Sequence, residues 1–542
     1  MTPPAADPPP ISAGRKWAIT ITVMVVAFMQ ILDTSVTNVV LPHLQGSLSA
    51  GLDEVSWVIT SYLAANAIVI PATGWLVAVF GRTRFFLICC TLFTVSSFIS
   101  GAAPDLTTLI AARIFQGLGG GPIIPLSQAI LWEIFPIHQR GLAMAVWGVG
   151  FILGPILGPT VGGYLADEWS WRWIFYINLP VGILGFALAK ACLFDSPFQR
   201  KAGRIDGWGL GLMVVGFGCL QLVLDRGERE EWFDSSMIVA MSVIAVCALV
   251  GFLIRELMAH DPILDLSVFT DRNFATGATL ITVIGFGMFS SMLLVAVFTQ
   301  KLLGYDAWTA GLVLAPSGLG NVLSLFASGI VMRVDQRLML GFGCLLNAVS
   351  LYMMTSLTLG MDYWALALPR LIQGIAVGFI FVPLSTLTLA TIQREKLVNA
   401  AAAYGMMRNI GGSVGIALVT TVLAQRSQYH QATLVSHVNV WDPETRARMA
   451  TWTSHFATQG ADTFTAERRA VAMLYRETVM QAQLLAYTDD FWLLALLFAA
   501  VPLLLPFMRR IRLSPPPAGA PVEPERRKAA GDEALRDAPD HM

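Results

Sequence analysis

The stretch DLTTLIAARIFQGLGGGPIIPLS, residues 105–127, decides the fold because the chain contains a second version of it, DYWALALPRLIQGIAVGFIFVPLS, at residues 362–385. In each copy an Asp is followed eight residues later by an Arg and then by Gln-Gly, and a shift of 257 residues takes Asp105 to Asp362. The same shift relates glycines of the next apolar segment: Gly148, Gly154 and Gly158 to Gly405, Gly411 and Gly415. Agreement over two consecutive segments indicates that the chain consists of two homologous halves.

The composition indicates the environment of these halves. Of the 542 residues, 55% are hydrophobic and 13% are charged, whereas a soluble protein carries roughly a quarter charged residues. Apolar runs of about 18 residues or more recur along the chain, and each is long enough to cross a hydrocarbon core of about 30 Å as a helix. We therefore expect an all-α polytopic membrane protein with fourteen transmembrane helices.

The repeat also predicts the domain organisation. Parallel halves related by an axis along the membrane normal are typical of transporters, whose sites lie near the midplane between the halves. Lys and Arg gather in alternate short loops, which places both termini in the cytoplasm. The predicted parts are a cytoplasmic tail (1–16), an N-terminal six-helix bundle (17–195), a linker with two extra helices at 207–256 (196–260), a C-terminal six-helix bundle with a long outer loop at 427–488 (261–510), and a disordered cytoplasmic tail (511–542).

One acid lies where an acid is costly. Asp33 belongs to FMQILDTSVTNVVLP, residues 28–42, inside the first apolar run. A charged carboxylate at the bilayer centre costs about 2.5–3.5 kcal/mol on insertion scales, and a low dielectric favours the protonated form. Asp33 is therefore predicted to bind a proton in one access state and release it in the other, the alternative being a structural acid hydrogen-bonded to a neighbouring helix. No acid occurs at the matching depth of the second half, in GFGMFSSMLLVAVFTQ, residues 285–300.

Four segments carry a resemblance to a known family: ILDTSVTNVVLP around Asp33, LIAARIFQGLGGGPIIPLSQ around Arg113, GPILGPTVGG at residues 154–163, and LQLVLDRGEREEWFDSS around Asp225. On these segments the chain resembles the fourteen-span drug:proton antiporter branch of the major facilitator superfamily and, within it, the EmrB-like exporters. GPILGPTVGG is similar to the fifth-span motif of that branch, which is associated with export. The chain departs from the family pattern at Ala78, where a loop motif usually has Asp, and at Ala145, where the fifth-span motif often has another Gly.

The resemblance implies a function. It implies a proton-coupled secondary exporter of hydrophobic or amphipathic compounds in a bacterial inner membrane, working by alternating access of two six-helix halves. It also implies a separately encoded periplasmic adaptor of the membrane-fusion type and an outer-membrane channel, with the loop at 427–488 as a docking surface. The alternatives are a narrow exporter of a siderophore, lipid or metabolite, an uptake permease, and a non-transporting sensor or scaffold.

Arg113 is the expected partner of Asp33. Guanidinium is effectively always charged, so an arginine in apolar sequence needs a counter-charge. Asp33 can supply it if the first and fourth spans adjoin, as the resemblance implies. Movement of Arg113 between access states would then load and release the proton, the alternative being a fixed salt bridge that organises the bundle.

Further predictions concern packing, substrate contacts and other acids. Small residues at i, i+4 and i+8 let helix backbones approach closely, and this face is predicted at the interface of the halves: Gly154, Pro155, Gly158, Pro159, Gly162 and Gly163. The candidate substrate contacts are polar residues in or near spans: Gln30, Asn38, Asn66, Gln116, Gln128 and Arg370. The further candidate acids are Asp225 and Glu133.

Enzymatic motifs are absent or unsuitable. The sequence has no G-x4-GK[ST] phosphate loop and no H-E-x-x-H or Cys/His cluster. GGSVG, residues 411–415, fits a nucleophile-elbow pattern but lies inside an apolar span with no strand before it. We therefore expect no enzymatic activity, metal or cofactor, and no nucleic acid as a partner; the expected partners are small amphipathic molecules, protons and lipid.

Overall fold

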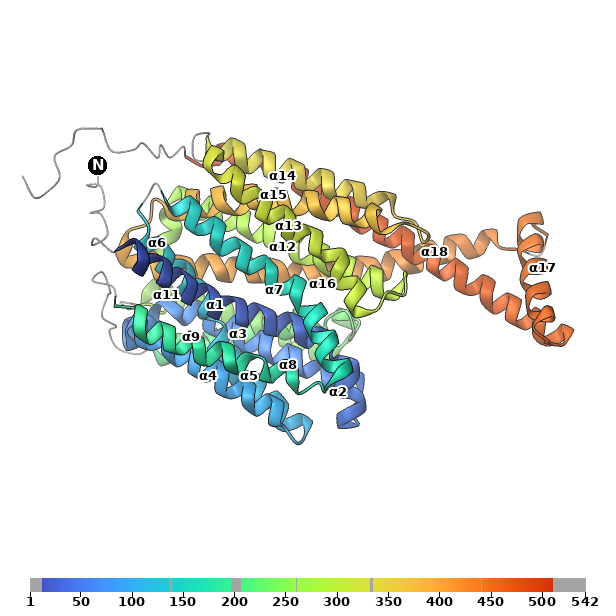
Figure 1. The fold of residues 1–542 in the computed structure, drawn as a ribbon, viewed down its shortest axis with the longest axis horizontal. Helices are drawn as coiled ribbons and strands as arrows, with labels where there is room; N and C mark the ends of the chain where they lie inside the picture. Colours follow the sequence, from blue (N-terminus) through green and yellow to red (C-terminus); the bar gives the residue numbers. More distant parts are fainter. Residues whose placement is uncertain are drawn as a thin grey trace, which may run out of the picture.

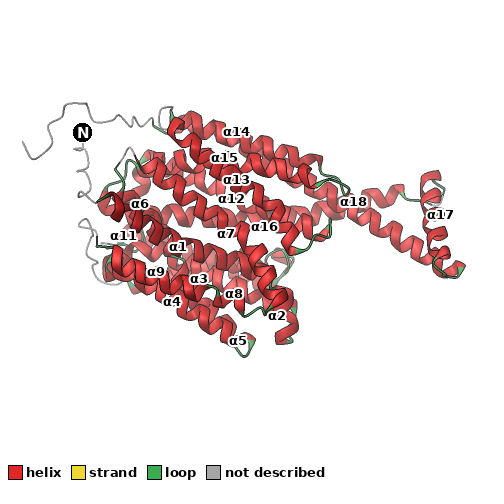
Figure 2. Cartoon of the chain, viewed as in Figure 1, coloured by secondary structure: helices red, strands yellow, loops and turns green. Residues whose placement is uncertain are grey.

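The structure is a computed structural model, and it describes residues 12–136, 139–195, 206–259, 261–331, 335–439 and 441–509. Within these ranges the chain is helical and contains no strand (Figure 2). The first half contains α1 (Ala13–Val39), α2 (Leu41–Leu48), α3 (Leu52–Phe80), α4 (Arg82–Ala102), α5 (Leu106–Gly120), α6 (Ile123–Ile134), α7 (Arg140–Glu168), α8 (Trp173–Tyr176) and α9 (Asn178–Cys192). The expected all-α fold is confirmed.

The remaining helices form the insert and the second half. The insert contains α10 (Gly207–Arg226) and α11 (Ser236–Met258). The second half contains α12 (Arg272–Lys301), α13 (Ala307–Val331), α14 (Gln336–Met353), α15 (Tyr363–Leu389), α16 (Leu397–His437), α17 (Pro443–Thr458) and α18 (Thr463–Ala500). Short 3-10 helices are η2 (Trp232–Asp234), η3 (Leu266–Thr270), η4 (Met354–Ser356), η5 (Arg394–Lys396) and η6 (Val501–Phe507).

Many of these helices are long enough to cross a membrane. Twelve helical segments in the described part of the chain satisfy both the length and the hydropathy expected of a span. Two more helices, α7 and α13, are 29 and 25 residues long, and the side chains of some of their residues lie outside the described set. A polytopic membrane protein is therefore confirmed, while the count of fourteen spans stays a prediction.

The repeat reappears in how its helices begin. Asp105 caps α5 by accepting a hydrogen bond from the N–H of Thr108 at 2.8 Å. Asp362, its equivalent, caps α15 by accepting from the N–H of Tyr363 at 2.7 Å. An Asp at this position satisfies one of the backbone donors that have no partner within the helix. The first Asp of each copy thus sets the start of the fourth span in its half.

The two halves meet through reciprocal helix pairs. The repeat makes α3 equivalent to α13 and α7 equivalent to α16, and in the structure α7 packs on α13 while α16 packs on α3 (Figure 1). The Asn321 amide of α13 donates to the carbonyl of Gly148 on α7 at 3.3 Å. A Cβ placed on Gly74 of α3 would lie 3.1 Å from Cα of Asn399 on α16. Related surfaces of each half therefore form the seam between them.

The insert and one extension complete the molecule. Helices α10 and α11 pack together, and α10 lies against both α3 and α16, so the insert covers one seam between the halves. At the end of the bundle away from the N-terminus, α16 and α18 run past the other helices and carry α17 (Figure 1). The predicted loop at 427–488 is thus mostly helical. We call this end outer and the end where α1 begins inner, after the predicted orientation.

The predicted tails fall mostly outside the described residues. Of the segment 1–16, residues 13–16 belong to α1, so the first helix begins earlier than expected. Ser12 caps it by accepting a hydrogen bond from the N–H of Arg15 at 3.4 Å. The segment 511–542 lies entirely outside the described residues.

Candidate functional site

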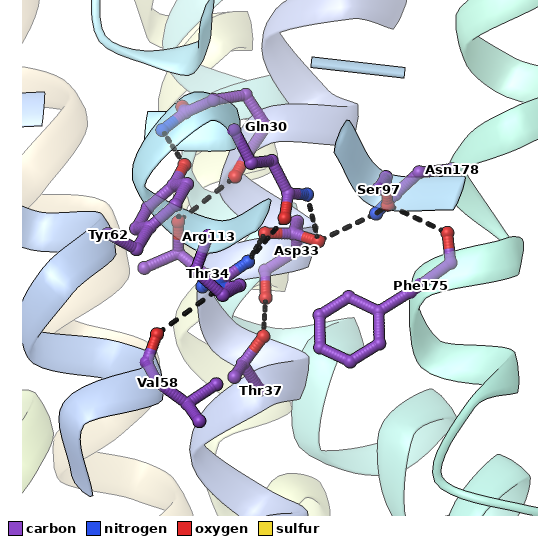
Figure 3. Close-up of polar contacts among 11 residues, drawn as sticks. Gln30, Asp33, Thr34, Thr37, Val58, Tyr62, Ser97, Arg113, Phe175 and Asn178 are labelled. Carbon is purple, nitrogen blue, oxygen red and sulfur yellow. Dashed lines mark hydrogen bonds and ion pairs between the residues drawn. The ribbon is translucent and has the colours of Figure 1, made fainter. Parts of the chain in front are cut away.

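Asp33 is held at the centre of a buried polar network. It lies within the 27-residue helix α1 and is 1% exposed. Its carboxylate accepts hydrogen bonds from Arg113 Nη1 at 2.6 Å, from Gln116 Nε2 at 2.9 Å and from Asn178 Nδ2 at 2.7 Å (Figure 3). The predicted pairing of Asp33 with Arg113 is therefore present. A buried carboxylate is tolerated when its charge is paired and its oxygens are hydrogen-bonded, and this one satisfies both conditions.

Arg113 is fixed by groups from three helices. Besides Asp33 on α1, its Nη1 donates to Gln116 Oε1 one turn along α5 at 2.9 Å, and its Nε donates to the Val58 carbonyl of α3 at 3.2 Å. The guanidinium carbon lies 4.1 Å from the ring centroid of Tyr62, which also belongs to α3. A guanidinium over an aromatic face gains a cation–π attraction that strengthens as water is excluded. Arg113 therefore retains favourable contacts even without the charge of Asp33.

The network extends to the remaining helices of the half. Gln30 of α1 donates to the Tyr62 hydroxyl at 3.0 Å. Asn178, at the start of α9, shares its amide between Asp33 and the Ser97 hydroxyl of α4 at 3.0 Å, and Ser97 donates to the Phe175 carbonyl at 2.8 Å (Figure 3). Networks of this kind are stable when fully satisfied and sensitive to the change of one member. A proton on Asp33 would thus alter contacts on α1, α3, α4, α5 and α9.

The second half contains the same arrangement without the acid. Arg370 of α15 donates from Nη1 to Gln373 and from Nη2 to the Ser291 carbonyl at 3.3 Å, and Gln373 Nε2 donates to Ser291 Oγ at 3.0 Å. Ser291 of α12 thus accepts a hydrogen bond from Gln373, just as Asp33 accepts one from the equivalent residue, Gln116. Arg370 is buried, no carboxylate pairs with it among the described side chains, and its Nε has no hydrogen-bond partner.

The glycine face of α7 does not lie where the sequence analysis placed it. Cβ atoms on Gly154, Gly158 and Gly162 would lie 2.4–2.7 Å from side-chain atoms of α1 in the same half: Ile31, Ser35 and Val36. The expectation that these glycines pack at the interface between the halves is therefore wrong. They face α1, and the seam with α13 uses another side of α7, where Gly148 lies.

The other residues of that motif add little to this picture. Gly163 is buried. The side chains of Pro155 and Pro159 lie outside the described residues, so their predicted place at the interface of the halves stays a prediction. The equivalent glycines of the second half, Gly411 and Gly415, approach the backbone of α12 in the same way, with Cβ positions 2.1 Å and 2.5 Å from the carbonyl oxygens of Thr282 and Phe286.

The remaining candidate contacts are dispersed. Gln128 of α6 is buried, and its amide nitrogen lies 3.9 Å from the sulfur of Met144 on α7. Asn66 is buried on α3 near Gly121, whose Cβ would lie 2.9 Å from its amide oxygen. The side chain of Asn38 lies outside the described residues. Among the candidates with described side chains, Gln30 and Gln116 join the Asp33 network, Asn66 hydrogen-bonds Tyr62 at its edge, and Arg370 forms the core of its counterpart.

The two further candidate acids have structural partners. Glu133 of α6 forms an ion pair with Arg82 at the start of α4, and Arg82 also donates to the Phe194 carbonyl at 2.7 Å. Asp225, near the outer end of α10, accepts a hydrogen bond from Thr60 of α3. Both acids therefore link one helix to another, and neither belongs to the Asp33 network.

At the inner end, the segment between α11 and α12 is attached to the start of α16. Lys396 pairs with the Asp265 carboxylate at 3.0 Å, and Asn399 exchanges hydrogen bonds with the Asp265 backbone. Burial raises the pKa of the Asp265 carboxyl, but hydrogen bonds from Ser267 and Lys396 outweigh it and hold the pKa below its usual range. Asn399 also abuts Gly74 of α3. This segment thus reaches the seam between α3 and α16 through Asn399.

Sequence reasoning missed three residues of these sites. Asn178 follows a span boundary and gave no signal of its own. Ser291 lies in an apolar run as an ordinary serine, and its importance follows only from its contacts with Arg370 and Gln373. Asp490 of α18 is completely buried, and the pair Asp489-Asp490 at the edge of the last predicted span was a visible signal. Among the described residues no cluster of three His, Cys, Asp or Glu side chains is placed to hold a metal.

Comparisons with known proteins agree with this arrangement. A sequence profile of the Major Facilitator Superfamily matches residues 23–416. The multidrug export protein EmrB of Haemophilus influenzae is 34% identical over 504 residues, which cover 92% of this chain and 97% of that protein. The fatty acid resistance protein FarB of Neisseria gonorrhoeae is 34% identical over 459 residues, covering 84% of this chain and 89% of FarB. In fold, the chain is similar to the crystal structure of a double-tryptophan mutant of XylE, with a TM-score of 0.59, 14% identity, and coverage of 92% of this chain and 97% of that one.

Proposed function

Since the chain belongs to the Major Facilitator Superfamily as an EmrB-like exporter, we propose that it is a proton-coupled antiporter that exports hydrophobic and amphipathic compounds by alternating access. Its two halves would rock about the seams formed by α7 with α13 and α3 with α16. The proton gradient supplies the work, about 2.3 kcal/mol per charge per 100 mV plus the contribution of the pH difference.

The observation that carries the proposal is the buried pair of Asp33 and Arg113. Arginine stays charged, so the pair responds to protons through Asp33. When Asp33 binds a proton it loses the charge that attracts Arg113, and the guanidinium keeps its contacts with Gln116, the Val58 carbonyl and the Tyr62 ring. When Asp33 releases the proton, the ion pair at 2.6 Å forms again. One proton thus switches the half between two contact sets, as an antiporter requires.

The helical extension supports a proposal about partners and location. Large aromatic side chains are exposed along it, among them Trp441 at 84%, Phe464 and Tyr475, and aromatic residues are enriched where proteins contact one another. We propose that the extension of α16, α17 and α18 binds a separately encoded periplasmic adaptor of the membrane-fusion type that leads to an outer-membrane channel. The protein would then lie in a bacterial inner membrane with both termini in the cytoplasm.

A narrower second function has one specific observation in its favour. The likeness to the fatty acid resistance protein FarB is as high in identity as that to EmrB, 34% in each case. A long-chain fatty acid is an amphipathic compound, so export of a lipid is a restricted form of the same function. Competition between a fatty acid and a lipophilic cation for transport distinguishes a broad exporter from a lipid exporter.

The test is substrate-driven proton movement in proteoliposomes. We compare the parent protein with Asp33→Asn, which keeps the shape of the side chain and removes its charge. The matched control is Asp225→Asn, because Asp225 hydrogen-bonds Thr60 outside the network. Equal thermal stability and elution volume establish that each variant is folded before transport is measured.

We expect substrate to release protons from loaded vesicles with the parent and the Asp225→Asn control, and Asp33→Asn to lose this exchange. Proton exchange that persists in folded Asp33→Asn would contradict Asp33 as the coupling acid. Absence of substrate-driven proton movement in the parent would contradict the proposed function itself.

A further inference from the structure

A second buried acid in the chain lies far from Asp33 in sequence and has a different environment. Asp490 of α18 is 0% exposed, and neither oxygen of its carboxyl group has a hydrogen-bond donor. Asp33 is equally buried, but its oxygens accept three hydrogen bonds, one of them from a guanidinium. The two acids thus represent a compensated and an uncompensated carboxyl group in one protein.

Next to Asp490 a partly exposed cluster leads to the outer surface. Asp489 accepts hydrogen bonds from Arg426 Nε at 2.6 Å and His430 Nε2 at 2.7 Å, both from α16. The side chains of Asp489 and Arg426 are a third or more exposed, so water reaches this cluster. It links α16 to α18, the two helices that form the extension (Figure 1). Asp490 is therefore one residue from a water-accessible, hydrogen-bonded acid.

In the described part of the chain, α12 and α14 bring no charged side chain to the level of Asp490, and Arg426 of α16 pairs with Asp489 instead. On α12 the charged residues, Arg272 and Lys301, stand at the two ends of the helix, and on α14 the one charged residue, Arg337, stands at the inner end and pairs with Asp335. The level of Asp490 follows from two contacts between α12 and α18. Phe298 and Tyr487 make an edge-to-face contact with ring centroids 5.4 Å apart, and a Cβ on Gly287 would lie 2.3 Å from the Phe498 ring.

These contacts fix the depth of Asp490. The two contacts are eleven residues apart on α12, from Gly287 to Phe298, and eleven apart on α18, from Tyr487 to Phe498. Residue numbers rise along one helix as they fall along the other, so the helices run antiparallel. Asp490 therefore lies level with Val295. Val295 lies four residues on the outer side of Ser291, which corresponds to about 6 Å along a helix. Asp490 thus lies about one helical turn outside the layer of Arg370 and Ser291, between that layer and the cluster of Asp489, Arg426 and His430.

The physical consequence concerns the charge state of the group. An ionised carboxylate without donors or a counter-charge is unfavourable in a protein interior, whereas the protonated carboxyl group is neutral. The buried conformation therefore favours bound proton, and any movement of α18 that exposes Asp490 to the water near Asp489 favours its release. Such a dependence of proton binding on conformation is what a proton-driven transporter uses.

We propose that Asp490 is a second proton-binding site, filled from and emptied to the outer side through the cluster of Asp489, Arg426 and His430. The proton passes from water to a carboxylate oxygen of Asp490, forming one O–H bond, and the reverse step returns it to water. This inference rests on the proposed proton-coupled export and adds to it: one acid in each half, Asp33 with a fixed cation and Asp490 without one.

The test counts protons without transport. Purified protein in lightly buffered detergent solution is acidified from mildly alkaline to mildly acidic pH, and the acid consumed is compared among the parent, Asp490→Asn, Asp490→Glu and Asp33→Asn. We expect Asp490→Asn to take up one proton fewer per molecule than the parent. Asp490→Glu, which keeps a carboxyl group, should match the parent, and Asp490→Asn combined with Asp33→Asn should show the sum of the two single losses.

A proton count for folded Asp490→Asn equal to that of the parent would overturn the proposal. If that variant does not fold, infrared spectroscopy of folded Asp33→Asn gives a second test. We expect a protonated-carboxyl band that shifts in D2O and is lost at alkaline pH, and its absence would overturn the proposal as well. Because neither measurement uses substrate, the result stands whether or not Asp33 couples transport.

In proteoliposomes, Asp490→Asn should leave the number of protons exchanged per substrate unchanged, because a proton that enters and leaves Asp490 on the outer side does not cross the membrane, while Asp33→Asn abolishes exchange. A reduced ratio in Asp490→Asn would show that the proton of Asp490 crosses the membrane and would overturn its exchange with the outer side alone.

Discussion

The layer around Asp33 in the first half and the layer around Ser291 in the second half are two versions of one design. In each, an arginine and a glutamine one turn apart on the fourth span reach toward the first span: Arg113 and Gln116 in one half, Arg370 and Gln373 in the other. In the first half they meet a carboxylate, and in the second a serine hydroxyl and a backbone carbonyl.

The difference shows which residues of this layer belong to the architecture shared by both halves and which residue responds to protons. The arginine and glutamine are present in both halves, so they belong to the shared architecture. The carboxylate is present in one, so the response to protons is confined to that half at this depth. In the first half, the amide of Asn178 on α9 donates a hydrogen bond to Asp33. In the second half, the register of α12 and α18 places Leu494 opposite Ser291. The second half therefore also lacks the amide donor.

The largest expected effect comes from converting the first half into the second. Asp33→Ser leaves Arg113 buried with no counter-charge, and removing one partner of a buried pair costs about 3–5 kcal/mol. We expect thermal unfolding in detergent to occur at a markedly lower temperature. In the double variant Asp33→Ser with Arg113→Gln no charge remains, so it should unfold at a higher temperature than Asp33→Ser alone. A double variant less stable than both single variants would show that the pair is not what holds this layer together.

Several features of this comparison are visible in the sequence itself. Long apolar runs, the shift of 257 residues and Asp33 in an apolar stretch led to the all-helical fold. The pairing of Asp33 with Arg113 also needed the family resemblance, which implies that the first and fourth spans adjoin. The direction of the glycine face was predicted wrongly because a helix has several sides. A run of small residues indicates a close approach, and only the fold shows that Gly154 and Gly158 approach α1 and not the other half.

Other features depended on contacts between distant segments. Ser291 and Asn178 are common residues whose roles arise from neighbours on other helices. Asp490 appeared to lie at the edge of the last span, but α18 is continuous through Thr463–Ala500, and this continuity buries the residue. A span boundary estimated from hydropathy therefore placed Asp490 at the edge of the membrane, although α18 continues past this residue and it is buried in the bundle.

A second comparison concerns the inner ends of the halves, where an arginine near the start of the third span binds the carbonyl at the end of the last span. Arg82 donates to the Phe194 carbonyl at 2.7 Å, and Arg337 donates to the Met508 carbonyl at 3.2 Å. Arg82 is 3% exposed and pairs with Glu133, whereas Arg337 is 30% exposed and pairs with nearby Asp335.

Arg82→Gln should therefore destabilise the protein by about 2–3 kcal/mol, since hydrogen bonds to buried charged groups are lost. Arg337→Gln should cost less than about 1 kcal/mol, as expected for an ion pair in contact with water. The two melting temperatures in one detergent measure the difference. Equal losses would mean that the carbonyl contact, which the two arginines share, determines the stability of both ends.

The glycines provide a smaller effect with controls inside the repeat. Gly415→Ala would set a Cβ 2.5 Å from the Phe286 carbonyl oxygen, and Gly158→Ala would set one 2.4 Å from the Ser35 side chain. Overpacking costs about 1–3 kcal/mol, and Gly415→Ala should cost more because a backbone carbonyl within a helix moves less readily than a serine side chain. Gly148 and Gly405 have no atom within 4 Å of a Cβ, so alanine there should be neutral or slightly stabilising. A loss at Gly405 as large as that at Gly415 would contradict the helix contacts described for α12 and α16.

The smallest expected effect has the opposite sign, because it gives the second half the acid that it lacks. Ser291→Asp sets a carboxylate beside Arg370 and Gln373, whose donors already point to this residue. We expect a gain of about 1 kcal/mol, since a hydrogen bond to a charged group is worth about 1.5–3 kcal/mol and the larger side chain must be fitted into a packed layer.

The sign of the effect of Ser291→Asp is diagnostic when Arg370 is changed. In an Arg370→Gln background the same substitution buries an acid with no cation and should destabilise the protein. A stabilising Ser291→Asp that becomes destabilising in Arg370→Gln would establish that the second half has kept the cationic part of the design and lost its acid. If Ser291→Asp destabilises the protein to the same extent in both backgrounds, Arg370 does not act as an available counter-charge, and the likeness of the two layers is one of shape alone.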